Sequence, residues 1–525
     1  MTEQTSTSLL PQKSQEKSDL SRYLPEVYMR KISWVPFILT ALLASVIGGI
    51  GISFGSMEVK VFAFAAIIGI IVVMAIYQKP ELGAYLLTIM VFTNASDLLT
   101  DEGLPGVNKP LVAVIFVSIL ANYLLRTGKF SNLPEMTRVE WSLLGFYLAI
   151  VLSTFVAPDK GEAFDIIIDV TKDILIGVIL FITLNTREKW ETCLRLFLTV
   201  MTVVAGLGVL KMALGLDQTF LGLAQLSNFG QVDDSGMLRY GGPIGESNMW
   251  GQALAATFPI AVYRLKYEKK NSRKFLMAIA SLLILLAVIY TNSRGAFVAL
   301  GIVIPLILLQ MKVKPLYIMM AGLALVSLFA VLPENYSQRL MSLNVFFAPQ
   351  NEYAIQQDDS LVGRSNQIRA GLAMFQNNPL LGVGFGNFSA NYWDYANQLG
   401  LVNVGMRASS QIARHPHSLY VEILSETGII GFITFSIFFY YLFAYMIHAR
   451  KKYEAHVTDS DWASWMTALT FALITFLISG LFLHGLLFRY IWLLIGYILS
   501  ALAINKDLLR AMQPRPLKNH HNHHG

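Results

Sequence analysis

The chain has 525 residues, of which 54% are hydrophobic and only 14% are charged. Soluble domains carry roughly 25% charged residues, so this composition excludes a soluble multidomain protein, and it equally excludes collagen, coiled-coil, disulfide-rich and disordered proteins. A membrane protein with many spans remains. The net charge of +6 is an excess that such proteins place in cytoplasmic loops, so it implies no nucleic-acid partner. The single cysteine, Cys193, excludes a disulfide framework and any cysteine-based metal site.

The N-terminal residues 1–32 are polar and lack the apolar core of a signal peptide, so we expect a disordered cytoplasmic tail. Runs of about 20 apolar residues predict an all-α, polytopic membrane protein. The fold is expected to have about 12–14 transmembrane helices and a large periplasmic loop containing short helices. The candidate spans are 34–56, 59–77, 81–99, 110–126, 141–157, 165–184, 194–214, 248–265, 274–292, 295–311, 315–332, 418–447, 462–483 and 485–505.

The loop charges test this arrangement, because Lys and Arg accumulate in cytoplasmic loops. Every second connection is basic, for example 264–274, and the connections between them are acidic or mixed. This alternation predicts that both termini are cytoplasmic. The expected parts are a tail (1–32), a helix bundle of about 11 spans (33–332), a periplasmic loop with catalytic motifs (333–416), C-terminal transmembrane helices (417–505) and a cytoplasmic tail (506–525).

Two long external segments are predicted, at 215–247 and 333–416. The second contains no lysine but keeps arginines at 339, 364, 369, 407 and 414. The planar guanidinium fork binds phosphate or carboxylate with two parallel hydrogen bonds. These arginines therefore indicate an anionic ligand, with ordinary surface arginines as the alternative.

The first short motif is Ser293-Arg294-Gly295, at the outer junction of two predicted spans. Its short connections hold Arg294 near the membrane surface, either for a ligand or as a snorkelling side chain at a helix end. In the preceding external segment, Arg239 lies in a Gly- and Pro-rich turn, and Asn248 is predicted to open the next helix. The N-terminus of that helix would offer free N–H groups to an anion.

The second motif is Gly363-Arg364, followed by a short amphipathic helix over 366–377. Ile368, Leu372 and Phe375 fall on one helical face, and Arg369 lies on the same helix. A Gly-rich stretch, 382–386, comes next. No preceding strand supports a dinucleotide fold, so we interpret it as a flexible turn returning the chain to the membrane.

The third motif begins at Arg414-His415-Pro416-His417, at the mouth of the span 418–447. Thirty residues make about 45 Å of helix, longer than the hydrocarbon layer, so the first turns project outward or the helix bends near Gly428. Glu422 and Glu426 share one face. A neutral His417 can accept a proton, although a capping cluster with solvated glutamates is an alternative.

Two further groups of polar residues belong to the predicted spans. Asp165, Asp169 and Asp173 recur every four residues beside Lys172, and they form either structural ion pairs or an ion path. At an external hairpin, His484-Gly485 precedes Arg489. Interfacial anchoring is the expected role there, with lining of a lipid-phosphate site as the alternative.

In their order and spacing these motifs resemble the O-antigen ligase/polymerase superfamily of bacterial membrane glycosyltransferases. The resemblance covers about 235–445 and rests on Ser293-Arg294-Gly295, Gly363-Arg364, the stretch 378–384 and the segment from His417 to Gly428. The chain departs from the family in having Ser418 after the motif histidine, where many members have Asn, and Ile368 in place of an aromatic residue.

The resemblance implies an enzyme of the bacterial inner membrane that transfers or polymerises glycan from an undecaprenyl-diphosphate donor at the periplasmic face. It would be an O-antigen ligase or a polysaccharide polymerase, including an exopolysaccharide polymerase. The acceptor would be a glycan, lipid or protein, and polysaccharide-assembly proteins would be partners. No cofactor and no metal are implied. A secondary transporter using the charged stripe of the sixth span is the alternative.

The resemblance and the chemistry assign roles to individual residues. Arg294 and Arg364 would clamp the diphosphate, and His417 would take the proton of the acceptor. Substrate-binding roles are expected for a second group: Arg239, Asn248, Arg369, Arg414, His415, Glu422 and Arg489.

Overall fold

The computed structural model describes residues 57–101, 106, 108–122, 136–227, 238–316, 318–320, 322–323, 359–401, 414–456, 460–485 and 488–511. The chain divides into two compact units, Met1–Ala75 and Ile76–Gly525. The predicted N-terminal tail and first span, most of the span 315–332, and the end of the C-terminal tail lie outside the described residues, as do Arg339 and Arg407.

In the first unit, the described part is the larger portion of α2 (Met57–Gln78). The second unit consists of helices and one short pair of strands. Its elements in chain order are α3 (Glu81–Thr93), α4 (Ala95–Asp101), α5 (Asn108–Ala121), α6 (Arg138–Thr154), α7 (Lys160–Thr183), α8 (Arg187–Leu214), β1 (Gln225–Leu226), β2 (Tyr240–Gly242), α9 (Ser247–Tyr267), α10 (Asn271–Thr291), α11 (Arg294–Gln310), α15 (Asp359–Asn377), α16 (Phe388–Gln398), α17 (Leu419–His456), α18 (Ser460–Ser479) and α19 (Arg489–Ala511).

Several of these helices have the length and apolar composition of membrane spans. Among the described residues, five qualify: Arg187–Leu214, Asn271–Thr291, Leu419–Ala455, Asp461–Ser479 and Arg489–Leu509. The protein is an all-α, polytopic membrane protein, as the composition predicted. The expected total of about 12–14 spans stays a prediction.

The predicted span 81–99 is not one helix. Asn94 adopts the left-handed conformation (φ 51°) and ends α3, and α4 begins at the next residue. The Asn94 side chain donates to the carbonyl of Pro243 at 3.1 Å, so the break is fixed by a contact with the external segment. The count of apolar residues alone did not indicate this break.

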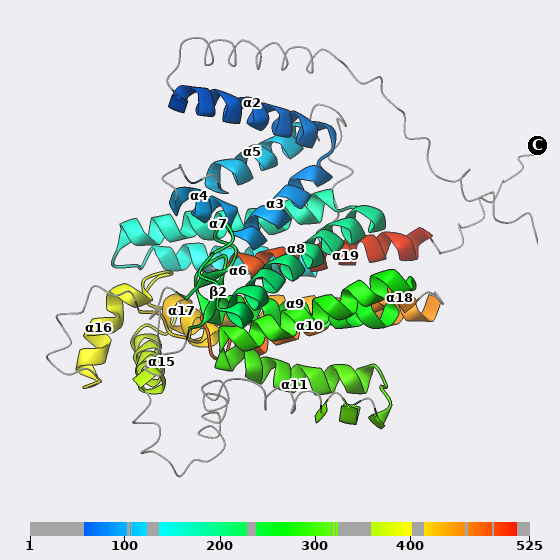
Figure 1. Cartoon of the computed structure of the whole chain (residues 1–525). Helices are drawn as coiled ribbons and strands as arrows, with labels where there is room; N and C mark the ends of the chain where they lie inside the picture. The colour runs from blue at the N-terminus through cyan, green and yellow to red at the C-terminus, as the bar shows by residue number, and fades with distance from the viewer. Residues whose placement is uncertain are drawn as a thin grey trace, which may run out of the picture. The chain divides into compact units, whose positions relative to one another are not determined.

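The centre of the second unit is α9, which is buried along almost its whole length. It packs between α10 and α18, and the three run alongside one another (Figure 1). Small residues permit this packing, as is common between membrane helices. A Cβ on Gly251 would lie 2.7 Å from Oγ1 of Thr291 and 2.8 Å from Cβ of Ser293. The start of α9 is thereby held against the junction of α10 and α11.

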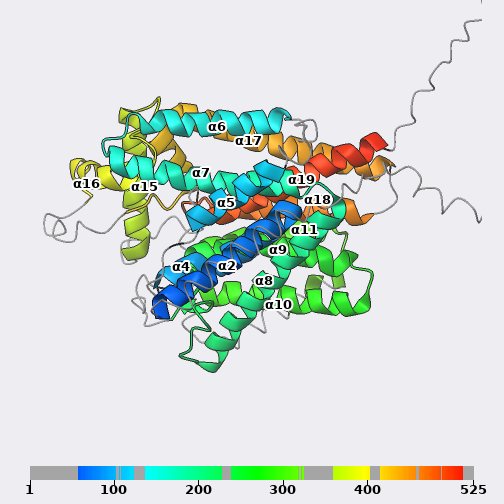
Figure 2. The same ribbon diagram turned by 90° about the horizontal axis from the view of Figure 1, so that it is seen from above.

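A second layer pairs α6 with α17 and α7 with α19, and α6 lies along α17 in the view from above (Figure 2). The backbones of α7 and α19 approach closely, since a Cβ on Gly177 would lie 2.8 Å from the carbonyl oxygen of Trp492. The short helices α15 and α16 lie at one end of the bundle in both views (Figures 1 and 2). They are the described part of the predicted large loop.

The long helix α17 is interrupted at Gly428, which has φ 63° and ψ −163°. Its length predicted either an outward projection of the first turns or a bend near Gly428, and the bend is present. The Gly-rich loop 379–388 takes over the hydrogen bonds that the break releases. On one side, the carbonyls of Ser425 and Glu426 accept from the N–H groups of Val383 and Gly384 at 2.8 and 3.2 Å. On the other, the N–H groups of 429 and 430 donate to the carbonyls of 379 and 380 at 2.8 and 3.3 Å.

The side chain of Glu426 completes this junction. It is only 5% exposed, and its carboxylate accepts from the backbone N–H of Gly386 at 2.9 Å and of Phe388 at 3.1 Å. Residues 382–388 are all buried. The interpretation of this stretch as a flexible turn was therefore wrong: it is a packed, hydrogen-bonded element. The glycines are needed because all three have positive φ and the loop is closely packed. A Cβ on Gly382 would lie 2.4 Å from the carbonyl carbon of Glu426 in α17, and one on Gly384 would lie 2.4 Å from Cα of Ala157.

The predicted helix 366–377 lies within α15 and ends before Asn378-Pro379, as expected. Its predicted buried face was wrong, because Leu372 is 41% exposed. The buried positions are instead Gln367, Ala370 and Met374. The reason is a close approach to α17, where a Cβ on Gly371 would lie 2.6 Å from Cγ1 of Val421, so this face of α15 turns inward.

We expect Gly428→Ala to destabilise the protein. The backbone conformation at Gly428 is essentially restricted to glycine and costs other residues about 1–3 kcal/mol, and a Cβ there would lie 2.4 Å from the carbonyl carbon of Leu380. The midpoint of thermal unfolding of the purified protein should fall by several degrees.

The matched control is Gly145→Ala in α6, where a Cβ would meet nothing within 4 Å. This variant should unfold at or slightly above the wild-type temperature, because Ala favours a helix over Gly. Equal unfolding temperatures for Gly428→Ala and the wild type would contradict the role of the break.

Candidate functional site

The site is assembled where several helix ends meet, and the first of these is the junction of α10 and α11. Asn292 takes the left-handed conformation (φ 54°) and ends α10, so Arg294 becomes the first residue of α11. Thr291, Asn292 and Ser293 are buried, and Arg294 is half-buried. Arg294 is therefore held within the helix packing, and the snorkelling alternative does not describe it.

A chain of hydrogen bonds fixes Arg239 beside this junction. Its Nε donates to the carbonyl of Thr291 at 3.2 Å, and its Nη2 donates to Oδ1 of Asn248 at 2.9 Å. The backbone that follows Arg239 is held by pairing of β1 with β2. The next residue, Tyr240, donates through its hydroxyl to the carbonyl of Val204 at 2.8 Å. Arg239 is buried, so it braces the Arg294 junction from within.

The start of α9 differs from the expectation. The helix begins at Ser247, and Glu246 caps it by accepting from the N–H groups of Asn248 and Met249 at 3.1 and 2.5 Å. The predicted anion site at this N-terminus is therefore occupied by a carboxylate of the chain itself. Asn248 instead connects Glu246, to which its Nδ2 donates at 3.1 Å, with Arg239.

The histidine motif lies at the start of α17. His417 has φ 46°, a conformation that costs a non-Gly residue roughly 1–3 kcal/mol and concentrates at functional sites. The N–H of Leu419 donates to the carbonyls of Gly480 and Leu483 at 2.8 and 3.0 Å. His417 is thus fixed between the first turn of α17 and the hairpin that joins α18 to α19.

That hairpin brings in His484, which the sequence interpretation assigned to interfacial anchoring. Its side chain is instead buried against the motif histidines. The ring of His415 stacks on His484 with centroids 4.4 Å apart, and His417 meets it edge to face at 5.6 Å. No sequence signal links the two segments, because their proximity depends on how α17 and α18 pack.

Glu422 holds this hairpin in place. It is 2% exposed, and its carboxylate accepts from the N–H of Gly485 at 3.1 Å. With Glu426 on the Gly-rich loop, the two glutamates of α17 fix one loop each, so the alternative of a solvated pair is wrong.

Two arginines of the large loop reach the same region. Arg364, near the start of α15, is half-buried, and its charge acts on His417. Arg414 lies over the ring of Trp393 in α16, with Cζ 5.8 Å from the centroid, and its backbone N–H donates to Oγ of Ser389 at 3.2 Å. Arg369, by contrast, is exposed on α15.

A small polar pocket connects these parts. It has a volume of about 210 Å³, which includes open solvent. Its lining comes from Asn248 and Gln252 of α9, from Arg364 of α15, from the end of α18 with its hairpin, and from Ser293, Gly295 and Ala296 around the start of α11. The pocket therefore lies between the arginine motifs predicted at 293–295 and 363–364.

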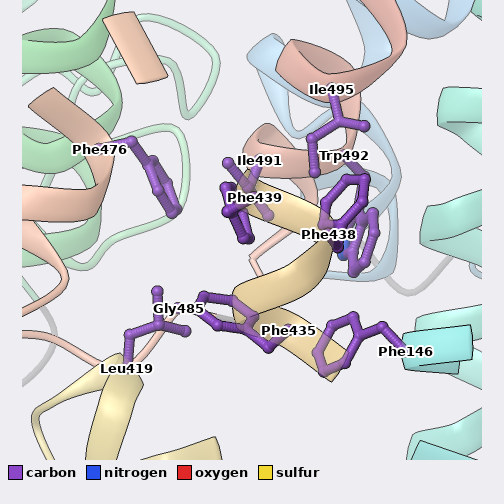
Figure 3. Close-up of a pocket in the computed structure, with 10 residues that line it drawn as sticks. All are labelled: Phe146, Leu419, Phe435, Phe438, Phe439, Phe476, Gly485, Ile491, Trp492 and Ile495. Carbon is purple, nitrogen blue, oxygen red and sulfur yellow. The ribbon is translucent and has the colours of Figure 1, made fainter. Parts of the chain in front are cut away.

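A separate apolar pocket of about 280 Å³ lies on the other side of the hairpin, lined by Gly485 and by side chains of α6, α17, α18 and α19. Phe435, Phe438 and Phe439 of α17 gather there with Phe146 and Trp492 (Figure 3). The hairpin 480–485 thus separates a polar pocket from an aromatic one.

The remaining predicted residues lie elsewhere. Nη1 of Arg489 donates to Oδ1 of Asn94 at 3.3 Å, and Nη2 lies 3.7 Å from Asp97, so Arg489 secures the break between α3 and α4. In α7, Lys172 lies 3.0 Å from Asp169 and 3.4 Å from Asp173. This is the ion-pair arrangement, and it accounts for most of the charged stripe on which the transporter alternative rested.

The electrostatics of the histidine cluster are dominated by burial and positive charge. Burial lowers the pKa of His417 to about 3, and the neighbouring cations, first Arg364, add to the effect. Burial likewise lowers the pKa of His484 well below its usual range. Both imidazoles are therefore neutral near pH 7. Nδ1 of His417 is buried and has no hydrogen-bond partner among the described residues, so it is available to a ligand.

Within the described residues, no group of three or more His, Cys, Asp or Glu side chains could hold a metal ion.

This arrangement predicts a pH dependence of stability. An unfolded histidine has a pKa of roughly 6.5, so between about pH 6.5 and the folded pKa of about 3 the unfolded state binds the proton and the folded state does not. Stability must then fall as the pH is lowered through this window. We expect the unfolding temperature to drop between about pH 7.5 and about pH 5, and to drop less in His417→Gln.

The control is His448→Gln, which changes an exposed histidine of α17 and should leave the wild-type pH dependence intact. Identical pH profiles for His417→Gln and the wild type would contradict a neutral, buried His417.

The comparisons with known proteins agree with this site. Residues 279–436 match the family model described as O-antigen ligase, a range that contains the Arg294 junction, α15, the Gly-rich loop and the start of α17 through Gly428. No curated protein matches the chain. Over residues 279–436 the chain is similar to the O-antigen ligase family, which supports a membrane enzyme that handles glycans.

Proposed function

We propose that the protein is a glycosyltransferase of the bacterial inner membrane that transfers or polymerises glycan from an undecaprenyl-diphosphate donor. The reaction would take place at the periplasmic face, with both termini in the cytoplasm and with polysaccharide-assembly proteins as partners. The observation that carries the proposal is the polar pocket between the start of α11 and Arg364, with His417 close enough to Arg364 for the guanidinium charge to lower the pKa of the imidazole.

The donor would bind through its diphosphate. Arg364 lines the polar pocket, and Arg294 is the first residue of α11, whose N-terminal residues line the same pocket. Positioned guanidinium groups stabilise the charge that develops on a leaving diphosphate. Arg239, braced by Asn248, would keep Arg294 in place. Arg414, His415 and Glu422 would shape the acceptor side around His417.

The proposed chemistry is a direct displacement with inversion. The acceptor hydroxyl oxygen forms a bond to the anomeric carbon while the bond from that carbon to the diphosphate oxygen breaks. The hydroxyl proton passes to His417, and the electron pair leaves with the lipid diphosphate, which the arginines hold. His417 is suited to this role because its Nδ1 is neutral and unpartnered among the described residues.

The low pKa of His417 would make it a weak base before substrate arrives. The negative charge of a bound diphosphate would offset the positive charge of Arg364, and this would raise the pKa toward the range in which a general base works well. Donor binding would therefore prepare His417 for proton transfer.

We expect His417→Ala, Arg294→Ala and Arg364→Ala each to lower glycan product by about 10²-fold or more, the usual scale for loss of a general base or of a group that stabilises developing charge. Product is measured by gel analysis of polysaccharide and of glycan-bearing lipid from cells that contain each variant at the wild-type protein level.

The matched control is Arg273→Ala. Arg273 is an exposed residue near the start of α10, at the opposite end of that helix from the Arg294 junction, so product should stay at the wild-type level. Full activity in all three test variants would refute the assignment.

A further inference from the structure

The polar pocket is too small for a lipid chain. Its space of about 210 Å³ includes open solvent, and the enclosed part has room for only about one water-sized group. It can take one compact polar group of a larger substrate, so the residues that line it indicate which part of that substrate enters.

One side of the pocket suits an anion. The first turn of α11 lines it, and Ser293, which precedes that helix, makes no capping hydrogen bond with its side chain. The start of α9 is different, because Glu246 caps it. Arg364 lines the pocket from α15. A phosphate at this side would meet both a guanidinium and a helix N-terminus.

Gln252 also lines the pocket. It needs a hydrogen-bond donor from a ligand, whereas an anion offers only acceptors. Gln252 is 1% exposed, and its Nε2 donates to the carbonyl oxygen of Phe476 at 3.3 Å. A flipped amide would place two acceptors against each other there, so the contact with Phe476 fixes the orientation. Oε1 therefore stays free as an acceptor, and it has no hydrogen-bond partner among the described residues.

A buried acceptor without a donor is destabilising, so Oε1 of Gln252 calls for a ligand that carries a hydrogen-bond donor. An ionised phosphate has none, whereas a sugar hydroxyl does. A sugar bonded to a phosphate provides both groups next to each other, which matches a pocket lined by both Arg364 and Gln252.

We propose that one hydroxyl group of the sugar bonded directly to the diphosphate enters this pocket, and that Gln252 accepts a hydrogen bond from it and so contributes to selection of the donor sugar. The proposal rests on the proposed function, because it assumes a lipid-diphosphate donor near Arg364. It adds a recognition site for the donor sugar, formed by α9 rather than by the arginine and histidine motifs.

The test measures binding of soluble donor analogues to the purified full-length protein. The probes are farnesyl diphosphate and five farnesyl diphosphates that each carry one sugar: glucose, galactose, mannose, N-acetylglucosamine or N-acetylgalactosamine. We expect at least one sugar to tighten binding relative to farnesyl diphosphate by about tenfold, the scale of one hydrogen bond to a buried group.

The variants separate the two halves of the pocket. Gln252→Met, which keeps the size but not the acceptor, should abolish the gain from the sugar and leave the Kd for farnesyl diphosphate within about twofold, because an apolar replacement removes only the hydrogen bond. Arg364→Ala should weaken binding of every probe. The matched control is Thr257→Val, a buried residue of α9 that lines a different, apolar pocket, and it should change neither Kd.

Two results would overturn the proposal: no sugar tightens binding to the wild type, or Gln252→Met weakens the bare and the sugar-bearing probes equally. The wild-type comparison decides the matter even where Gln252→Met fails to fold, and Gln252→Asn serves as a second variant. Failure of the proposed function gives a different pattern, because farnesyl diphosphate itself would then not bind to the wild type.

Discussion

At Gly428 the helix α17 exchanges its own hydrogen bonds for bonds to the Gly-rich loop 379–388, and the rest of the site depends on that exchange. A backbone group left unpaired inside a membrane protein costs several kcal/mol, so the break in the helix and the loop are stable only together. The carboxylate of Glu426 adds two further bonds to the loop. Two motifs that lie far apart along the chain thus form one structural unit.

This unit determines where the reactive side chains lie. The loop ties α15 and α16 to α17, so that Arg364 and Arg414 face the start of the helix that carries His417. Glu422, one turn before Glu426, holds the hairpin 480–485 in place by accepting a hydrogen bond from the N–H of Gly485. Neither glutamate needs to touch a substrate, because each sets the position of a loop through backbone N–H groups.

The charges of the site suit an anionic ligand. Arg364 lines the polar pocket, and the nearby histidines His417 and His484 stay neutral through burial. A diphosphate would balance the arginines and raise the basicity of His417 in the same step. Gln252 contributes a free hydrogen-bond acceptor, to which a sugar hydroxyl can donate and an ionised phosphate cannot.

The sequence by itself determined the membrane class, the positions of most helices in the described residues and the resemblance to the O-antigen ligase family, because these depend on local composition and on short motifs. It offered the bend near Gly428 as one of two alternatives. Only the tertiary structure decided that Glu246 closes the start of α9, that the outward face of α15 is the one with Leu372, and that His484 joins His417. The physical reason is that each of these outcomes depends on a contact between segments distant in the chain, and a periodic or compositional pattern carries no information about which partner will occupy a given face.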